Sequence, residues 1–122
     1  MLKEYKDVRQ VEGEGRRRWF LDDYFDLIVW YDEEQTIKGF QLCYDKKDHE
    51  RAVTWTREDG YSHHKIDDGD VTGRAKMTPV LVSDGIFARD DIADRFLENA
   101  ADIDRDIGSF VYNRIKSYTL KP

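Results

Sequence analysis

A carboxylate set among apolar neighbours is the residue of this sequence with the clearest potential for chemistry. Asp26 lies in residues 24–30, a run of otherwise aromatic and aliphatic side chains. Apolar surroundings raise the pKa of a carboxyl group, which would suit Asp26 to act as a general acid or base. The alternative is a structural role, in which Asp26 faces water or accepts a hydrogen bond from Gln41 on the next strand. If Asp26 is catalytic, His63 is its expected acid–base partner.

Two adjacent histidines, His63 and His64, invite a metal site, with Cys43 as a further ligand. Adjacent residues on a strand point to opposite faces, so the two imidazoles cannot hold one ion unless the strand bulges. No H-x-x-x-H or C-x-x-C spacing occurs, and the calcium-loop-like stretch from Asp68 has Pro79 where a bidentate glutamate is required. We therefore expect no metal ion and no cofactor.

The stretch Arg16-Arg17-Arg18-Trp19-Phe20 joins cations to aromatics, as nucleic-acid-binding surfaces do. The whole chain, however, carries 26 Asp and Glu against 20 Lys and Arg, a net charge of −6. An acidic balance opposes binding to nucleic acid and to anionic membranes. A solvated strand with cross-strand ion pairs is the favoured interpretation, and we expect neither a nucleic-acid nor a membrane partner.

Length and cysteine content set the class of protein. The chain has 122 residues, the size of one ordinary domain, and a single cysteine, so no disulfide can form within it. The first residues contain no apolar run typical of a signal peptide, and the longest apolar stretch, 27–31, is far too short to span a bilayer. These features predict a soluble cytoplasmic protein.

A sheet in the first two-thirds of the chain, followed by helices, must position these residues. Segments rich in aromatic and β-branched residues occur near 5–11, 17–21, 24–31, 36–44, 51–57 and 61–66, with a short apolar piece at 80–82. From about residue 89 apolar residues recur at steps of three and four, and Asp102 or Asp104 is suited to cap a second helix. We predict a single α+β domain, residues 1–122. An antiparallel β-meander of about four to six strands spans about 5–82, and one or two C-terminal helices at about 89–118 pack on one face.

Two predicted turns decide which residues share a face of the sheet, because side chains alternate along a strand. A four-residue turn at 32–35 and a two-residue hairpin loop at 59–60 set the registers, the second placing Trp55 opposite His64. One face then becomes apolar and is the expected core. It comprises Phe25, Leu27, Val29, Phe40, Leu42, Val53, Trp55 and Ile66.

The other face is polar and holds the expected site. Asp26 is placed opposite Gln41, and the same row continues through Thr54 to Lys65, with His63 in a neighbouring row. The binding candidates are Tyr24, Trp30, Gln41, Thr54 and Lys65, and the catalytic candidates are Asp26 and His63.

Two functions fit this arrangement. The favoured one is a non-catalytic binding or protein-interaction module that uses the polar face, because the residues form no compact nucleophile–base–orienter set. The alternative is a small acid–base enzyme with Asp26 and His63 in a cleft over the sheet. The partner would be a protein or a small molecule, and an exposed Trp30 and Ile28 would form an apolar patch suited to a homodimer.

Four stretches carry a resemblance to known sequences, and the likeness runs over most of the chain. They are Arg17-Arg18-Trp19-Phe20, Asp22-Asp23-Tyr24-Phe25-Asp26-Leu27-Ile28-Val29-Trp30-Tyr31, Gly39-Phe40-Gln41-Leu42-Cys43-Tyr44-Asp45 and Gly60-Tyr61-Ser62-His63-His64-Lys65-Ile66-Asp67-Asp68-Gly69. The sequence resembles a family of small, uncharacterised bacterial proteins. The resemblance implies a bacterial cytosolic protein and brings no activity, cofactor or catalytic residue with it.

Overall fold

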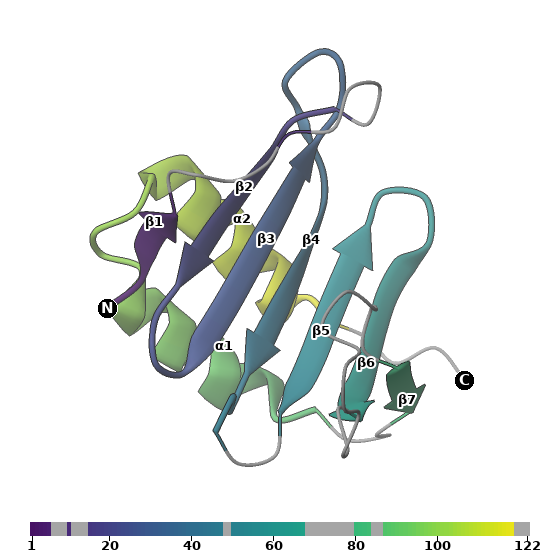
Figure 1. Cartoon of the computed structure of the whole chain (residues 1–122), viewed down its shortest axis with the longest axis vertical. Coiled ribbons are helices and arrows are strands. Elements are labelled where there is room, and N and C mark those ends of the chain that lie inside the picture. Colours follow the sequence, from purple (N-terminus) through teal and green to yellow (C-terminus); the bar gives the residue numbers. More distant parts are fainter. Residues whose placement is uncertain (6–9, 11–14, 48–49, 68–79, 84–86, 119–122) are drawn as a thin grey trace.

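A sheet forms one layer of the protein and two helices form a second layer behind it (Figure 1). The computed structural model describes residues 1–5, 10, 15–47, 50–67, 80–83 and 87–118. Within them an antiparallel sheet has its strands in the order of the sequence. The strands are β1 (Lys3–Tyr5), β2 (Arg17–Leu21), β3 (Phe25–Tyr31), β4 (Ile37–Tyr44), β5 (Arg51–Thr56), β6 (Gly60–Asp67) and β7 (Val80–Ser83), and the helices are α1 (Arg89–Asn99) and α2 (Arg105–Lys116). The α+β class, the antiparallel meander and its C-terminal helices are confirmed.

Neither helix of the described chain has the length and apolar character needed to cross a membrane.

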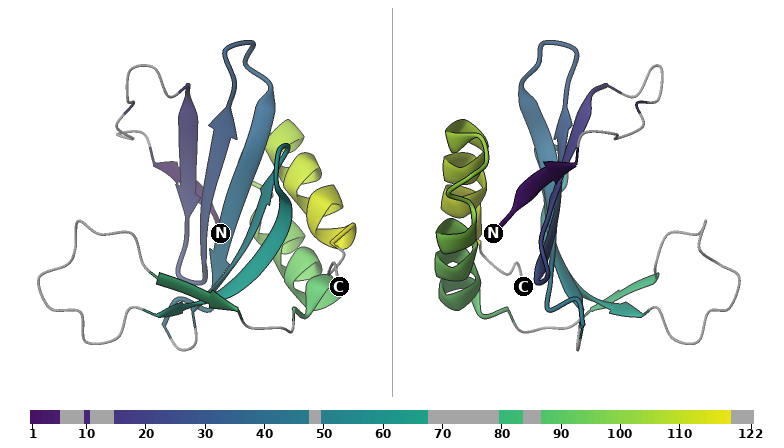
Figure 2. Two further views of the ribbon diagram at one scale, coloured as in Figure 1. Left: turned by 90° about the vertical axis from the view of Figure 1, so that its right-hand side faces the viewer. Right: turned by 60° about the vertical axis from the view of Figure 1, so that its left-hand side comes forward.

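Both helices pack on the same side of the sheet, which we call the covered face (Figure 2). The ring of Phe25 meets that of Phe96 from α1 edge-on, with centroids 5.9 Å apart, and Phe40 meets Phe110 from α2 in the same way at 6.4 Å. Edge-to-face pairs of this kind add to the stabilisation that burial alone provides. Side chains with no exposed surface are Leu2, Phe20, Phe25, Leu27, Val29, Phe40, Leu42, Val53, Ala52, Ala93, Phe96, Val111 and Ile115. Every core-face residue predicted on β3, β4 and β5 is buried, Trp55 with 8% of its surface exposed and the others with none.

The side of the sheet turned away from the helices is called the open face here. Because alternate residues of each strand point to it, the strand registers define its composition. Three adjacent rows of side chains cross it. The middle row is Tyr5, Trp19, Ile28, Gln41, Thr54 and Ser62. On one side of it lies the row Lys3, Leu21, Asp26, Cys43, Ala52 and His64, and on the other side the row Arg17, Trp30, Gly39 and Thr56.

The register between β3 and β4 differs from the prediction by two residues. Asp26 lies opposite Cys43, and Gln41 lies opposite Ile28, because the turn includes Thr36. The Asp32 carboxylate accepts backbone N–H groups of Glu34 and Thr36 at 2.9 and 3.0 Å, and the register is irregular after Trp30. A shift by an even number leaves every side chain on its predicted face.

The register between β5 and β6 differs by three residues, and this prediction of faces is wrong. The hairpin loop has three residues, 57–59, followed by Gly60 at φ +75°, so that Trp55 lies opposite Tyr61 rather than His64. Such a three-residue loop with a glycine at positive φ is a common hairpin connection. An odd shift exchanges the faces, so His63 lies on the covered face and His64 on the open face. Ile66, predicted for the core, has no described side chain.

The two helices begin differently. The Asp104 side chain accepts the backbone N–H of Asp106 at 2.9 Å and thereby caps α2, while Ala88 at the start of α1 offers no side-chain cap. Asp104 also lies 3.4 Å from Arg18 on β2, whose guanidinium binds both carboxylate oxygens of Glu4 on β1. The arginine-rich stretch thus supplies the predicted cross-strand ion pair and links the sheet edge to α2.

Candidate functional site

Asp26 lies on the open face, where its carboxylate binds neighbouring side chains. Its Oδ1 accepts the indole N–H of Trp19 at 2.8 Å, and its Oδ2 lies 3.8 Å from the Lys46 amine. Lys46 is itself held by a hydrogen bond to the carbonyl of Asp22 at 2.8 Å. The carboxylate therefore fixes the orientation of the Trp19 ring, and this partner is not the Gln41 amide that the sequence predicted.

His63 is buried on the covered face, with only 6% of its surface exposed. Its Nε2 lies 2.5 Å from the hydroxyl of Tyr44, the two rings stack, and Phe87 and Tyr118 pack around the imidazole. Asp26 and His63 are thus on opposite faces of one sheet. The strand registers therefore contradict the prediction that Asp26 and His63 lie in one cleft.

Gln41 and Thr54 lie opposite each other on the open face, as predicted, and the Gln41 amide donates to the Thr54 hydroxyl at 3.1 Å. Burial raises the pKa of the neighbouring Cys43 thiol to about 12, so this sulfur is protonated and a poor nucleophile at neutral pH. Lys65 is not in this row, because Ser62 occupies the predicted place opposite Thr54. The polar half of the open face therefore satisfies much of its hydrogen bonding internally.

The other half of the open face, on β1, β2 and β3, is largely apolar. We call this group the apolar patch: Tyr5, Trp19, Leu21, Ile28 and Trp30. Tyr5 and Leu21 expose 46% and 36% of their surface, and the Tyr5 ring meets the Trp19 ring edge-on at 5.8 Å.

Three members of the apolar patch, Tyr5, Trp19 and Leu21, were not predicted as site residues. The alternation within 17–21 puts Trp19 and Leu21 on one face, but the pattern of residues alone does not show that this strand pairs with β3. The pairing is set by Asp22, whose carboxylate accepts the N–H groups of Tyr24 and Phe25 at 2.8 and 2.7 Å and closes the hairpin. Aspartate at the first position of a tight turn was the available signal.

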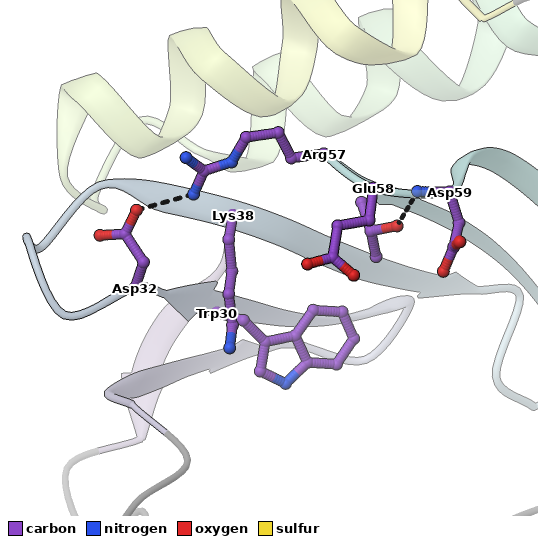
Figure 3. A pocket seen from close by; sticks show the side chains of 7 residues that line it. Trp30, Asp32, Lys38, Arg57, Glu58 and Asp59 are labelled. Carbon is purple, nitrogen blue, oxygen red and sulfur yellow. Dashed lines mark hydrogen bonds and ion pairs between the residues drawn. The ribbon is translucent and has the colours of Figure 1, made fainter.

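At one end of the apolar patch Trp30 lines an open cleft of about 770 Å³, whose walls come from the β3–β4 and β5–β6 turns (Figure 3). Arg57 donates to Asp32 at 2.7 Å, and this hydrogen bond holds the pKa of the Asp32 carboxyl below its usual range. Figure 3 shows this pair at one end of the cleft and Glu58 and Asp59 at the other. The remaining lining residues are Lys38 and Thr56.

Tyr24 belongs to a different cleft, of about 520 Å³, at the start of α1. The Arg95 guanidinium stacks on the Tyr24 ring with its carbon 3.5 Å from the ring centroid, and Arg51, Asp91 and Tyr44 also line the space. The two predicted rim aromatics, Tyr24 and Trp30, thus line separate clefts.

Among the described residues no group of three or more His, Cys, Asp and Glu side chains could hold a metal ion.

No family model, curated protein sequence or solved structure matches this chain. The resemblance to small bacterial proteins therefore stays a prediction.

Proposed function

We propose that this protein is a non-catalytic binding module that receives a protein partner on the open face of its sheet. The observation that carries the proposal is the apolar patch, which leaves Tyr5 and Leu21 exposed on the side of the sheet opposite both helices. Apolar patches beside polar rims mark interaction sites on proteins, and Trp and Tyr are enriched in interfaces.

The polar groups of the open face fit the same function. Gln41 and Thr54 bond to each other, and Asp26 bonds to Trp19. Polar groups that are already paired lose little when a partner removes water from them, whereas unpaired groups would carry a desolvation cost. Binding energy then comes mainly from burying Trp19, Leu21 and their neighbours.

The charge distribution favours a different, basic polypeptide over a second copy of this chain. The protein carries a net charge of −6, and two copies would repel. Glu58 and Asp59, at the Trp30 end of the apolar patch, have no ion-pair partner among the described residues. A second copy would bring the same excess of acids, while a basic partner would be attracted.

The proposal extends to location and origin. A protein whose single cysteine, Cys43, is a half-buried free thiol is suited to a reducing compartment, and we place it in the cytoplasm. A bacterial source follows from the sequence resemblance alone. Fractionation of cells that express the full chain, followed by immunoblotting, tests the location.

Two leucines on opposite sides of the molecule provide a matched test of the binding surface. Leu21 lies on the open face and Leu97 on α1, and they expose 36% and 47% of their surface. A photo-crosslinking amino acid at position 21 should capture a partner that the same group at position 97 does not. The captured protein is then purified, and its affinity is measured by calorimetry for the wild type, Leu21→Glu and Leu97→Glu.

We expect Leu21→Glu to weaken binding at least about tenfold, because a charge would be buried in the apolar contact, and Leu97→Glu to leave it unchanged. Equal weakening by both variants, or by Leu97→Glu alone, would overturn the proposed surface. Capture of a second copy of the chain, with a dimer in sedimentation equilibrium, would overturn the choice of a different polypeptide as partner.

A further inference from the structure

Trp30 belongs to two features at once. It is the last member of the apolar patch, and it also lines the cleft of about 770 Å³ between the β3–β4 and β5–β6 turns (Figure 3). A partner that covers the apolar patch therefore reaches the mouth of this cleft. The volume is within the range of sites that take a small ligand or a side chain.

The charges of the cleft are not balanced. Arg57 and Asp32 neutralise each other at 2.7 Å. Of the remaining groups, Glu58 and Asp59 are carboxylates and Lys38 is a single cation. Within the described residues neither Glu58 nor Asp59 takes part in an ion pair, so the cleft has an excess negative charge next to an aromatic ring.

An aromatic ring flanked by carboxylates binds cations in preference to neutral or negative groups. The face of a tryptophan attracts cations, and a guanidinium stacks on it while its N–H groups bond a carboxylate in a fork. Lysine offers a point charge without the planar stacking surface. The chemistry of Trp30, Glu58 and Asp59 together therefore fits an arginine side chain.

We propose that the Trp30 cleft is the specificity pocket of the module and takes an arginine side chain of the protein partner. The proposal rests on the proposed function, since the arginine would enter beside the apolar patch. The guanidinium lies against the Trp30 ring, and its donors face the carboxylates of Glu58 and Asp59. The apolar patch then supplies the bulk of the contact and the cleft selects for the basic residue.

The test uses the full chain and a blocked tripeptide, acetyl-Gly-Arg-Gly-amide, with acetyl-Gly-Gln-Gly-amide as the uncharged probe. Nitrogen–proton NMR spectra follow the three indole N–H signals, and the signal of Trp30 is assigned by its loss in Trp30→Phe. Only the Trp30 signal should move in a saturable way with the arginine peptide. The indole signals of Trp19 and Trp55 should stay in place.

A pair of double variants with equal charge change separates the cleft from the general field of the protein. Glu58→Gln with Asp59→Asn removes the two carboxylates of the cleft, while Glu33→Gln with Glu34→Gln removes two exposed carboxylates of the β3–β4 turn outside it. We expect the first pair to weaken arginine-peptide binding about tenfold or more and the second to change it less than twofold.

Equal weakening by the two pairs, a fixed Trp30 signal, or equal binding of the glutamine peptide would overturn the inference. Its failure is distinguishable from that of the proposed function. If Leu21→Glu abolishes partner binding while the arginine peptide never binds, only the pocket is wrong. If the peptide binds as expected but crosslinking shows no preference for Leu21, the pocket stands and the protein-binding surface is wrong.

Discussion

The covered face of the sheet buries its phenylalanines completely, whereas the open face leaves large apolar side chains partly in water. Phe25 and Phe40 on the sheet and Phe96 on α1, which packs against Phe25, have no exposed surface, while Tyr5 and Leu21 expose 46% and 36%. The covered face is filled by the helices of the same chain, and the open face has no such filling from either described helix (Figure 2). One face is therefore suited to stabilise the fold and the other to meet a partner.

Two neighbouring histidines show how sharply the backbone divides these roles. His63 is buried against Tyr44, whereas His64 lies on the open face opposite Ala52. Alternation along β6 is enough to give adjacent identical residues different environments.

The largest difference between the faces should appear when Phe96 is shortened. Phe96→Ala removes a ring that contacts Phe25 in the covered face, and we expect the free energy of unfolding to fall by about 3–5 kcal/mol. Urea denaturation followed by circular dichroism measures the loss. If the alanine variant does not fold, Phe96→Leu supplies a smaller truncation, and a loss under about 0.5 kcal/mol there would contradict a tightly packed covered face.

Removal of one hydroxyl on each face gives a closer comparison. Tyr44→Phe takes away the hydroxyl next to buried Nε2 of His63, and we expect a loss of about 1–3 kcal/mol because a buried polar atom loses that bond. Tyr5→Phe, on the open face, should change stability by less than about 0.5 kcal/mol. Thermal and urea unfolding of both variants measures the two losses, and equal losses would contradict the difference between the faces.

The helix layer that covers the sheet depends on the cap of α2. Asp104→Ala should cost about 1 kcal/mol, whereas Asp102→Ala, which removes a neighbouring exposed carboxylate, should cost almost nothing. A similar loss from both would show that the cap contributes nothing.

The contribution of Asp104 should also depend on pH. The bond from the Asp106 N–H and the nearby Arg18 lower the pKa of the Asp104 carboxyl in the folded protein. A lowered folded pKa means that the stabilisation is present above the pKa of the unfolded chain, about 3.9, and is lost as the pH falls through the lower folded value. The difference between wild type and Asp104→Ala, measured by urea unfolding at pH 7 and near pH 2.5, should therefore shrink in acid.

The smallest effect is expected on the open face itself. Leu21→Ser should change the free energy of unfolding by no more than about 0.5 kcal/mol, because the side chain is already partly in water. A loss of 2 kcal/mol or more, by the same urea measurement, would show that Leu21 is part of a core and would remove the distinction between the faces.

Much of the covered face could be predicted because alternation and helical periodicity are local properties of the sequence. The row that joins Gln41 to Thr54 was predicted and is observed, and Asp104, one of the two residues predicted to cap the second helix, is its cap. The position of His63 could not be predicted in this way. Asp59-Gly60 fits both a two-residue and a three-residue hairpin loop, and the choice between them exchanges the faces of β6.

The clefts were beyond sequence reasoning for a related reason. The Trp30 cleft is formed by side chains from two turns, and its shape depends on the conformation of Asp32 to Thr36 and of residues 57–59. Turn conformation decides which charged side chains meet, and the same letters allow several conformations. Trp30 itself was predicted, but its neighbours Glu58 and Asp59 were not.

The order of the strands has a consequence for how the chain folds during synthesis. Each described strand pairs with the next one along the chain, so the sheet can assemble hairpin by hairpin with little loop-closure entropy to overcome. The helices that cover it come last, at Arg89–Asn99 and Arg105–Lys116. In a nascent chain, we therefore expect the aromatic surface of the sheet to stay accessible to chaperones until residues 89–116 have left the ribosome. These residues then form α1 and α2 and cover it.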